Sequence, residues 1–144
     1  VCDFPSFTKV IWESMKVNDS MPEYVLARAA KIMEENNLKD YKRVGLYGLT
    51  YKENVDDFRE SPTLQLLEHQ SSHLAEPLKV YDPYITKNIV KNQYHDLDKF
   101  LNDVEFVIIM VKHDEIKNNI DKLKSKIVLD TQNICGNSNN IYKL

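Results

Sequence analysis

Residues 43–62 read RVGLYGLTYKENVDDFRESP, and this stretch decides which fold the sequence predicts. It opens with a short apolar run that ends at Leu49, typical of a buried strand and its exit. It closes with Ser61-Pro62, a pair that favours the first turn of a helix. Between Gly48 and Ser61 lie one Lys, one Arg and four acidic residues. A strand that leaves through so charged a loop into a helix indicates a βα unit with a ligand-binding turn.

The same alternation continues through the rest of the chain. Apolar runs predict further strands over 78–81, 93–95, 106–111 and 126–130, while 141–144 is either an edge strand or a tail. Helical patterns are expected over 61–74, 85–92, 97–102 and 116–123. The uninterrupted run at 106–111 suits a strand that is buried on both faces of a parallel sheet. The fold class is therefore α/β, a Rossmann-like doubly wound parallel sheet.

The first 36 residues stand outside this alternation. They show only helical patterns, over 4–17 and from Ser20 to about Asn36. A total of 144 residues suits one domain with an appendage. We therefore expect residues 1–36 to belong to a separate helical region and residues 37–144 to form the sheet domain.

Composition excludes several classes of partner. The net charge of −3 gives no basic field for nucleic acid or an anionic membrane surface. No apolar run approaches the ~20 residues that span a bilayer, and the start shows no signal-peptide pattern. Cys2 and Cys135 lie far apart and lack metal-ligand spacing, so two reduced thiols and a cytoplasmic location are expected.

Polar residues follow the expected carboxyl ends of the strands, where open α/β sheets bind ligands. They include Lys52 after the first strand, Asp82 after the second, Lys112 after the fourth and Gln132 after the fifth. In a Rossmann-like order the first and fourth strands are neighbours, which would place Lys52, Lys112 and Gln132 around one crevice. Such a crevice suits an anionic ligand such as a nucleotide. Solvated loop ends are an equally good interpretation of the pattern alone.

Other candidate sites have simpler structural interpretations. Gly45 and Gly48 lack the third glycine of a dinucleotide fingerprint, so classical NAD binding at this turn is weakly supported. Asp82 is a candidate for a ribose hydroxyl, but an Asp before Pro more often initiates a turn. Ser61 is a better helix cap than a nucleophile, because no motif pairs it with a base. We therefore predict no catalytic residue within this chain.

Metal and phosphoacceptor sites are also disfavoured. His69 and His73 lie one helical turn apart, but Gln70 stands where a zincin motif needs Glu, and surface histidines are the simpler interpretation. Three acids, Glu53, Asp56 and Asp57, precede a helix N-terminus, where the helix dipole favours them without a cation. A receiver domain would need an acidic pair directly after the first strand, where Tyr51-Lys52 stand. No metal site is predicted.

Residues 48–62 closely resemble the signature of the UDP-glucose/GDP-mannose dehydrogenase family. Further segments similar to the family are spread along the chain, at 17–22, 80–83, 113–115 and 130–133. The resemblance implies a C-terminal, nucleotide-sugar-binding Rossmann-like domain over 37–144. It implies that residues 1–36 are the tail of the central helical region, which supports a homodimer in this family. The family oxidises the C6 hydroxyl of a nucleotide sugar to a carboxylate with NAD.

The same resemblance assigns roles to single residues. Tyr51 and Lys52 match the aromatic-Lys pair that contacts the nucleotide sugar, and Arg59 matches an Arg that reaches toward the NAD diphosphate of the facing domain. Gln132 stands where the family usually has an Arg that holds the nucleotide, so it keeps hydrogen bonding but loses the charge. The main NAD domain and the Gly-Gly-x-Cys segment with the catalytic cysteine are expected upstream, and Cys2 lies past the expected position of that segment.

The substrate remains a choice among three nucleotide sugars. Residues 18–22 are most similar to the branch of the family that acts on UDP-N-acetyl-mannosamine, followed by UDP-glucose and GDP-mannose. A stand-alone nucleotide-binding module without catalysis is the alternative from a different class.

Overall fold

The computed structural model describes residues 17–38, 42–50, 52–56, 58, 61–73, 78–136 and 138–143. The helix predicted over 4–17 falls outside these ranges except for its last residue.

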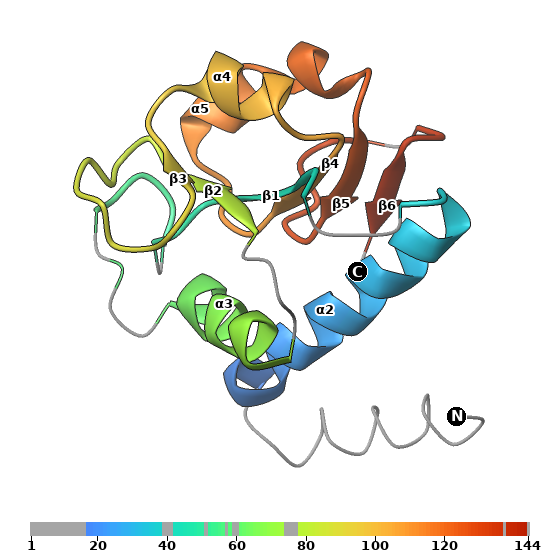
Figure 1. The fold of residues 1–144 in the computed structure, drawn as a ribbon. Helices are drawn as coiled ribbons and strands as arrows, with labels where there is room; N and C mark the ends of the chain where they lie inside the picture. Colours follow the sequence, from blue (N-terminus) through green and yellow to red (C-terminus); the bar gives the residue numbers. More distant parts are fainter. Residues whose placement is uncertain are drawn as a thin grey trace.

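Six parallel strands form one sheet in the order β3-β2-β1-β4-β5-β6, shown in Figure 1. The strands are β1 (Val44–Tyr47), β2 (Lys79–Tyr81), β3 (Gln93–Tyr94), β4 (Phe106–Ile109), β5 (Ile127–Asp130) and β6 (Ile141–Lys143). The order reverses between β1 and β4, the two central strands. This confirms the Rossmann-like doubly wound sheet and makes the last segment an edge strand.

Helices cover both faces of the sheet (Figure 1). One face carries α2 (Val17–Glu35) and α3 (Pro62–His73). The other carries α4 (Leu97–Asn102), α5 (Asp114–Lys117) and the 3-10 helix η1 (Ile120–Leu123). The helix predicted over 116–123 is therefore two short turns.

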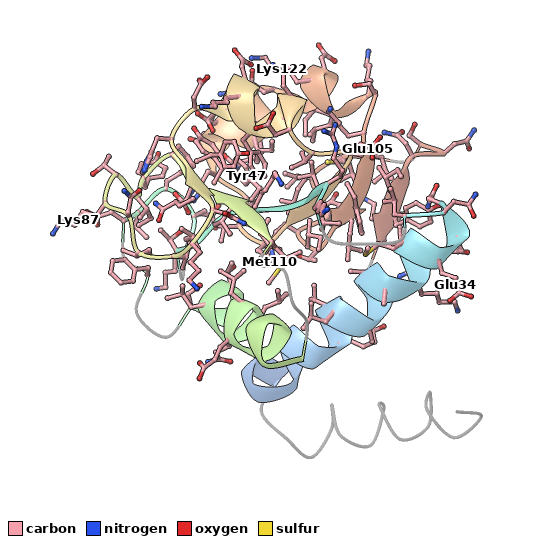
Figure 2. The ribbon with its side chains drawn as sticks, viewed as in Figure 1. Glu34, Tyr47, Lys87, Glu105, Met110 and Lys122 are labelled. Carbon is pink, nitrogen blue, oxygen red and sulfur yellow. The ribbon has the colours of Figure 1, made fainter. Side chains whose placement is uncertain are left out.

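The central strands alternate strictly between the two cores. Leu46 and Ile108 point into the core beneath α2 and α3, and Ile109 points into the core beneath α4 and α5. Figure 2 shows Tyr47 on the side of α4 and Met110 on the side of α3. Because both faces are buried, the whole of β1 and β4 must be apolar, which explains the unbroken run in the sequence.

The described part of α2 packs as a layer of this fold. Val25, Ala29 and Ile32 are fully buried in the same core as β1. Arg28 donates from Nε to the carbonyl of Lys143 at 3.2 Å, so α2 also contacts the edge strand β6. A domain boundary near residues 36 and 37 remains a prediction, and α2 is tightly packed against the sheet.

The helix predicted over 85–92 is wrong. The segment is a loop whose backbone is held by the side chain of Gln93. Gln93 accepts through Oε1 from the N–H of Ile89 at 2.8 Å and donates through Nε2 to the carbonyl of Lys87 at 2.8 Å. These bonds replace helical ones, and burial of Ile85 anchors the loop to the core.

Candidate functional site

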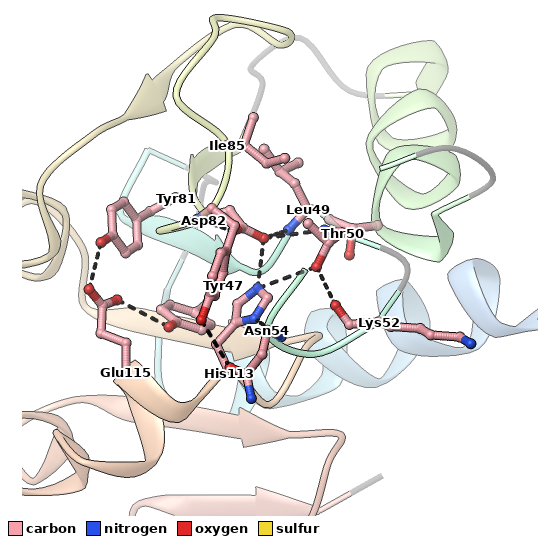
Figure 3. A network of polar contacts seen from close by, with 12 residues as sticks. Tyr47, Leu49, Thr50, Lys52, Asn54, Tyr81, Asp82, Ile85, His113 and Glu115 are labelled. Carbon is pink, nitrogen blue, oxygen red and sulfur yellow. Dashed lines mark hydrogen bonds and ion pairs between the residues drawn. The ribbon is translucent and has the colours of Figure 1, made fainter. Parts of the chain in front are cut away.

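A single buried carboxylate gathers the carboxyl ends of three strands. Asp82 Oδ2 accepts from the N–H of Leu49 at 2.6 Å, from the N–H of Thr50 at 3.2 Å and from His113 Nε2 at 2.9 Å (Figure 3). Its other oxygen accepts from the N–H of Tyr84 at 2.8 Å. Both oxygens are occupied and the residue is almost fully buried. The turn-forming interpretation of Asp82 is confirmed, and its carboxylate is buried and turned toward the backbone of these loops.

The loop after β1 is fixed from within by further bonds. The Thr50 hydroxyl donates to the carbonyl of Lys52 at 2.7 Å. The N–H of Asn54 donates to His113 Nδ1 at 2.8 Å, and Asn54 Oδ1 accepts from the N–H of Asp114 at 2.9 Å. The Lys52 side chain is exposed, and Figure 3 shows it pointing away from the network. A hydrogen-bonded peptide therefore presents an exposed ammonium group at the carboxyl edge of the sheet.

Glu115 anchors the start of α5 beside this network. It accepts from the hydroxyl of Tyr47 at 3.1 Å and from the hydroxyl of Tyr81 at 2.9 Å, as Figure 3 shows. Burial, reinforced by the Glu115 carboxylate, raises the pKa of both hydroxyls above the ordinary tyrosine range, so they stay protonated donors. The ends of β1 and β2 thereby hold α5, which fixes the adjacent His113.

The loop after β5 is built around a second buried carboxylate. The two oxygens of Asp130 accept from the N–H groups of Gln132, Ile134 and Cys135 at 2.8 to 3.1 Å, and from Lys143 Nζ at 2.8 Å. Burial acts to raise the Asp130 pKa. The bonds from Lys143, Cys135 and Gln132 outweigh it and lower the pKa below its usual range. Asp130 therefore shapes the turn that carries Gln132.

We expect Asp130→Asn to destabilise the protein by about 1.5–3 kcal/mol near neutral pH, the typical value of hydrogen bonds to a charged group. A carboxylate with a lowered pKa stabilises the fold above its unfolded pKa of about 3.9 and loses that contribution as the pH falls toward its folded pKa. The gap between the native protein and the variant should therefore close below about pH 4. Urea unfolding at a series of pH values measures it, and a gap that stays constant down to pH 3 would contradict this role.

The predicted site residues that are described follow neighbouring strands. Lys52 follows β1 and Gln132 follows β5, the latter half-buried with its amide nitrogen donating to the Thr131 hydroxyl at 3.1 Å. Lys112 follows β4, and its Nζ lies 3.9 Å from Glu53 Oε1, so it joins the β4 loop to the Lys52 loop. The sheet order places β1, β4 and β5 side by side. Tyr51 and Arg59 lie outside the described residues, and their roles remain predictions.

Four residues of the network were missed as functional candidates. Thr50 and Asn54 lie inside the conspicuous loop motif, and His113 and Glu115 lie inside the 113–115 segment. Their polar character at strand ends was the available signal. Which polar side chains turn inward depends on tertiary contacts across 31 to 68 residues, which local patterns do not encode.

The residues that the structure describes do not fit a classical dinucleotide cradle. Such a cradle needs a helix N-terminus directly after the first strand, whereas α3 begins at Pro62, far beyond the end of β1 at Tyr47. The acid at the end of the second strand, Asp82, is buried and already hydrogen-bonded. This agrees with the missing third glycine of the motif.

The described residues also offer no activated thiol and no metal site. Burial, followed by the nearby Asp130 carboxylate, raises the pKa of the Cys135 thiol to about 12. Cys2 and the side chains of His69 and His73 lie outside the described part of the chain. In the part of the chain that the structure covers, no group of three metal-ligating side chains occurs, and none of its helices is long and apolar enough to cross a bilayer.

Comparison with known proteins gives consistent matches. Residues 45–137 match the model of the UDP-glucose/GDP-mannose dehydrogenase family, UDP binding domain. UDP-N-acetyl-D-mannosamine dehydrogenase of Methanocaldococcus jannaschii is 37% identical over 134 residues, which cover 88% of this chain and 30% of that protein. NDP-N-acetyl-D-galactosaminuronic acid dehydrogenase of Ralstonia nicotianae is 28% identical over 89% of this chain and 30% of its own length.

A solved structure extends the likeness to three dimensions. The UDP-N-acetyl-mannosamine dehydrogenase of S. aureus superposes with a TM-score of 0.73 at 29% identity, covering 99% of this chain and 34% of that one. The chain thus spans about a third of the length of the proteins it matches. Fold, motif and matched residues agree. The chain belongs to the UDP-glucose/GDP-mannose dehydrogenase family, and residues 45–137 correspond to the UDP binding domain of that family.

Proposed function

We propose that this chain is the nucleotide-sugar-binding part of an NAD-dependent dehydrogenase that oxidises the C6 hydroxyl of a UDP-sugar to a carboxylate. Relatives of about three times its length are dehydrogenases, which supports a longer protein with a separate NAD-binding half. The absence of a classical dinucleotide cradle among the described residues supports the same division of labour. The chemistry of hydride transfer and the nucleophilic cysteine belong to that other half in this proposal.

One observation carries the proposal. Hydrogen bonds hold the Lys52 carbonyl and the Asn54 N–H, the Lys52 side chain is exposed, and the residue lies at the carboxyl edge where the strand order reverses. This edge belongs to the segment that matches the UDP binding domain. A cation on a hydrogen-bonded peptide at a switch point suits a diphosphate, because less ordering of that peptide is then needed when the ligand binds.

Neighbouring residues complete the proposed site. Tyr51 contacts the nucleotide sugar beside Lys52, and Gln132 offers an amide to the nucleotide from the β5 loop. Arg59 reaches the NAD diphosphate across the interface with the NAD-binding half, where its planar fork suits two phosphate oxygens.

The proposed substrate is UDP-N-acetyl-mannosamine, since the relatives from M. jannaschii and S. aureus are named as dehydrogenases of this nucleotide sugar. UDP-glucose and GDP-mannose are the other candidates. A cytoplasmic homodimer, joined through the central helical region at residues 1–36, is the proposed working form. Activity of the full-length protein against a panel of UDP- and GDP-sugars with NAD selects among the three substrates.

The chain is expected to bind UDP, and Lys52→Ala is expected to weaken that binding about 10- to 100-fold, the range that one lost charged hydrogen bond of 1.5–3 kcal/mol gives. Isothermal titration of the protein with UDP measures the effect. Full-length UDP-N-acetyl-mannosamine dehydrogenase of S. aureus, titrated with UDP-N-acetyl-mannosamine, is the positive control.

Lys87→Ala is the matched control, because Lys87 is an exposed lysine in the loop between β2 and β3, and its loss changes the net charge equally. Figure 2 shows it at the periphery of the molecule. Equal effects of the two substitutions would contradict a specific role for Lys52. No heat with UDP, against a working positive control, would overturn the proposed function. In the full-length protein Lys52→Ala should weaken nucleotide-sugar binding more than NAD binding.

A further inference from the structure

The His113 side chain links the Asp82 carboxylate directly to Asn54, which lies two residues beyond Lys52 in the same loop. Its ring is fully buried at the carboxyl end of β4, between the loops that follow β1 and β2. The exposed ring of Tyr84 packs against it with the ring centroids 4.8 Å apart, and the Tyr84 hydroxyl reaches Asn54 Oδ1 at 3.3 Å. The imidazole is therefore enclosed, and it contacts the loop after β1 through Asn54.

The hydrogen-bond partners define which ring nitrogen carries the proton. Nδ1 lies 2.8 Å from the N–H of Asn54, which can only donate, so Nδ1 accepts and is not protonated. Nε2 lies 2.9 Å from Asp82 Oδ2 and 3.3 Å from the Thr50 hydroxyl oxygen, both acceptors here, because that hydroxyl donates to the carbonyl of Lys52. The ring is thus a neutral imidazole protonated on Nε2. The contact with Asp82 is a hydrogen bond rather than an ion pair.

The two ring nitrogens have separate tasks. Nε2 completes the set of donors around Asp82, which joins the strand ends. Nδ1 holds Asn54, two residues beyond Lys52, in a left-handed conformation with φ of 56°. The Lys52 peptide is then fixed on one side by Thr50 and on the other by Asn54.

We infer that His113 is a positioning residue for the nucleotide-sugar site: its neutral imidazole sets the place of the Lys52 peptide through the bond from Asn54 to Nδ1. This inference rests on the proposed function, in which Lys52 binds the diphosphate. It assigns the Nε2 bond to stability and the Nδ1 bond to ligand binding.

Two conservative substitutions separate the tasks. In His113→Gln the side-chain amide nitrogen lies near the place of Nε2 and keeps the donor to Asp82, but the acceptor for Asn54 is lost. In His113→Asn the side-chain carbonyl lies near the place of Nδ1 and keeps the acceptor, but the donor to Asp82 is lost. His95→Gln is the control, because His95 is exposed, lies outside this network and hydrogen-bonds to Asn88.

Titration with UDP and urea unfolding are expected to rank the variants in opposite orders. His113→Gln should raise the Kd for UDP about tenfold or more, the factor of one buried hydrogen bond, and His113→Asn should stay within about threefold. His113→Asn should be the less stable of the two. The Asn54 amide should lose protection from hydrogen exchange in His113→Gln, and long-range proton–nitrogen spectra of the unchanged protein should show Nδ1 without a proton.

Several results would overturn the inference. One is that the two variants rank in the same order for loss of UDP binding and for loss of stability. Another is a proton on Nδ1 of His113. The third is an Asn54 amide that remains protected from hydrogen exchange in His113→Gln. Failure of the proposed function gives a different result: the unchanged protein does not bind UDP, or Lys52→Ala and Lys87→Ala have equal effects. The exchange and nitrogen measurements need no ligand and test the Asn54 bond in either case.

Discussion

Asp82→Ala is expected to lower the free energy of unfolding by about 3–5 kcal/mol, because it leaves several buried donors without an acceptor, at about 1–3 kcal/mol each. Without the carboxylate, the N–H groups of Leu49, Thr50 and Tyr84 and the Nε2 proton of His113 lose their acceptors. The contacts from Leu49, Thr50 and His113 are buried, so the loss of their acceptor is costly, whereas the N–H of Tyr84 is only partly buried. The variant should also bind UDP more weakly, because the Lys52 loop begins at two of these donors.

Asp98→Ala provides the comparison for this effect. Asp98 lies in the first turn of α4 and pairs with Lys122 at 2.6 Å, but its side chain is 66% exposed. Exposed pairs contribute at most about 1 kcal/mol, so this variant should remain close to the native protein. Urea unfolding followed by circular dichroism measures both. Similar losses in the two variants would show that the buried carboxylate does not organise the sheet edge.

Gly48→Ala is expected to cost about 2–4 kcal/mol, the sum of a strained backbone and an overpacked contact. Gly48 has a φ of 103°, which side chains rarely permit, and its N–H donates to the carbonyl of Tyr81 at 2.9 Å. A Cβ atom there would lie 2.8 Å from the backbone nitrogen of Val111 and 2.7 Å from its Cβ. Because one of these contacts is with backbone, β1 and β4 would have to separate at the point where the ligand loop begins.

Gly136→Ala distinguishes the two parts of that cost. Gly136 also has a positive φ, of 51°, but a Cβ atom there would meet nothing within 4 Å. This variant should lose only about 1–2 kcal/mol, the cost of the left-handed conformation alone. The same unfolding measurement applies, and a Gly48→Ala variant no less stable than Gly136→Ala would contradict the close approach of the two strands.

The layered fold follows largely from patterns that repeat along the sequence. The apolar run at 106–111 predicts a strand buried on both faces, and the residues from Val44 predict a short buried strand; the structure places β1 and β4 at the centre of a parallel sheet. Local patterns fail where a side chain replaces backbone bonds, as Gln93 does for residues 87–90. No sequence periodicity reveals that the Gln93 side chain replaces these backbone hydrogen bonds, because Gln93 is one polar residue among several in this segment.

The position of the candidate site was predictable from the sequence, but the hydrogen-bond network that forms it was not. The strand order alone places Lys52 near the reversal point, and the motif at 48–62 indicates a nucleotide sugar. The burial of the Asp82 and His113 side chains was not predictable, since an Asp before Pro and a His before Asp occur equally well on a solvated loop. Only the packing of three strand ends around them makes their burial favourable.

The long reach of the His113 contacts also sets an order of events during folding. The bond from Asn54 to His113 joins residues 59 positions apart, and the bond from Asp82 to His113 joins residues 31 apart. Closing such long loops precedes any gain from the contacts they allow. On the ribosome, the segment around Lys52 leaves well before its partner at residue 113 has been made. The loop that carries Lys52 is therefore synthesised before His113, and it can acquire its final shape only after that partner is available.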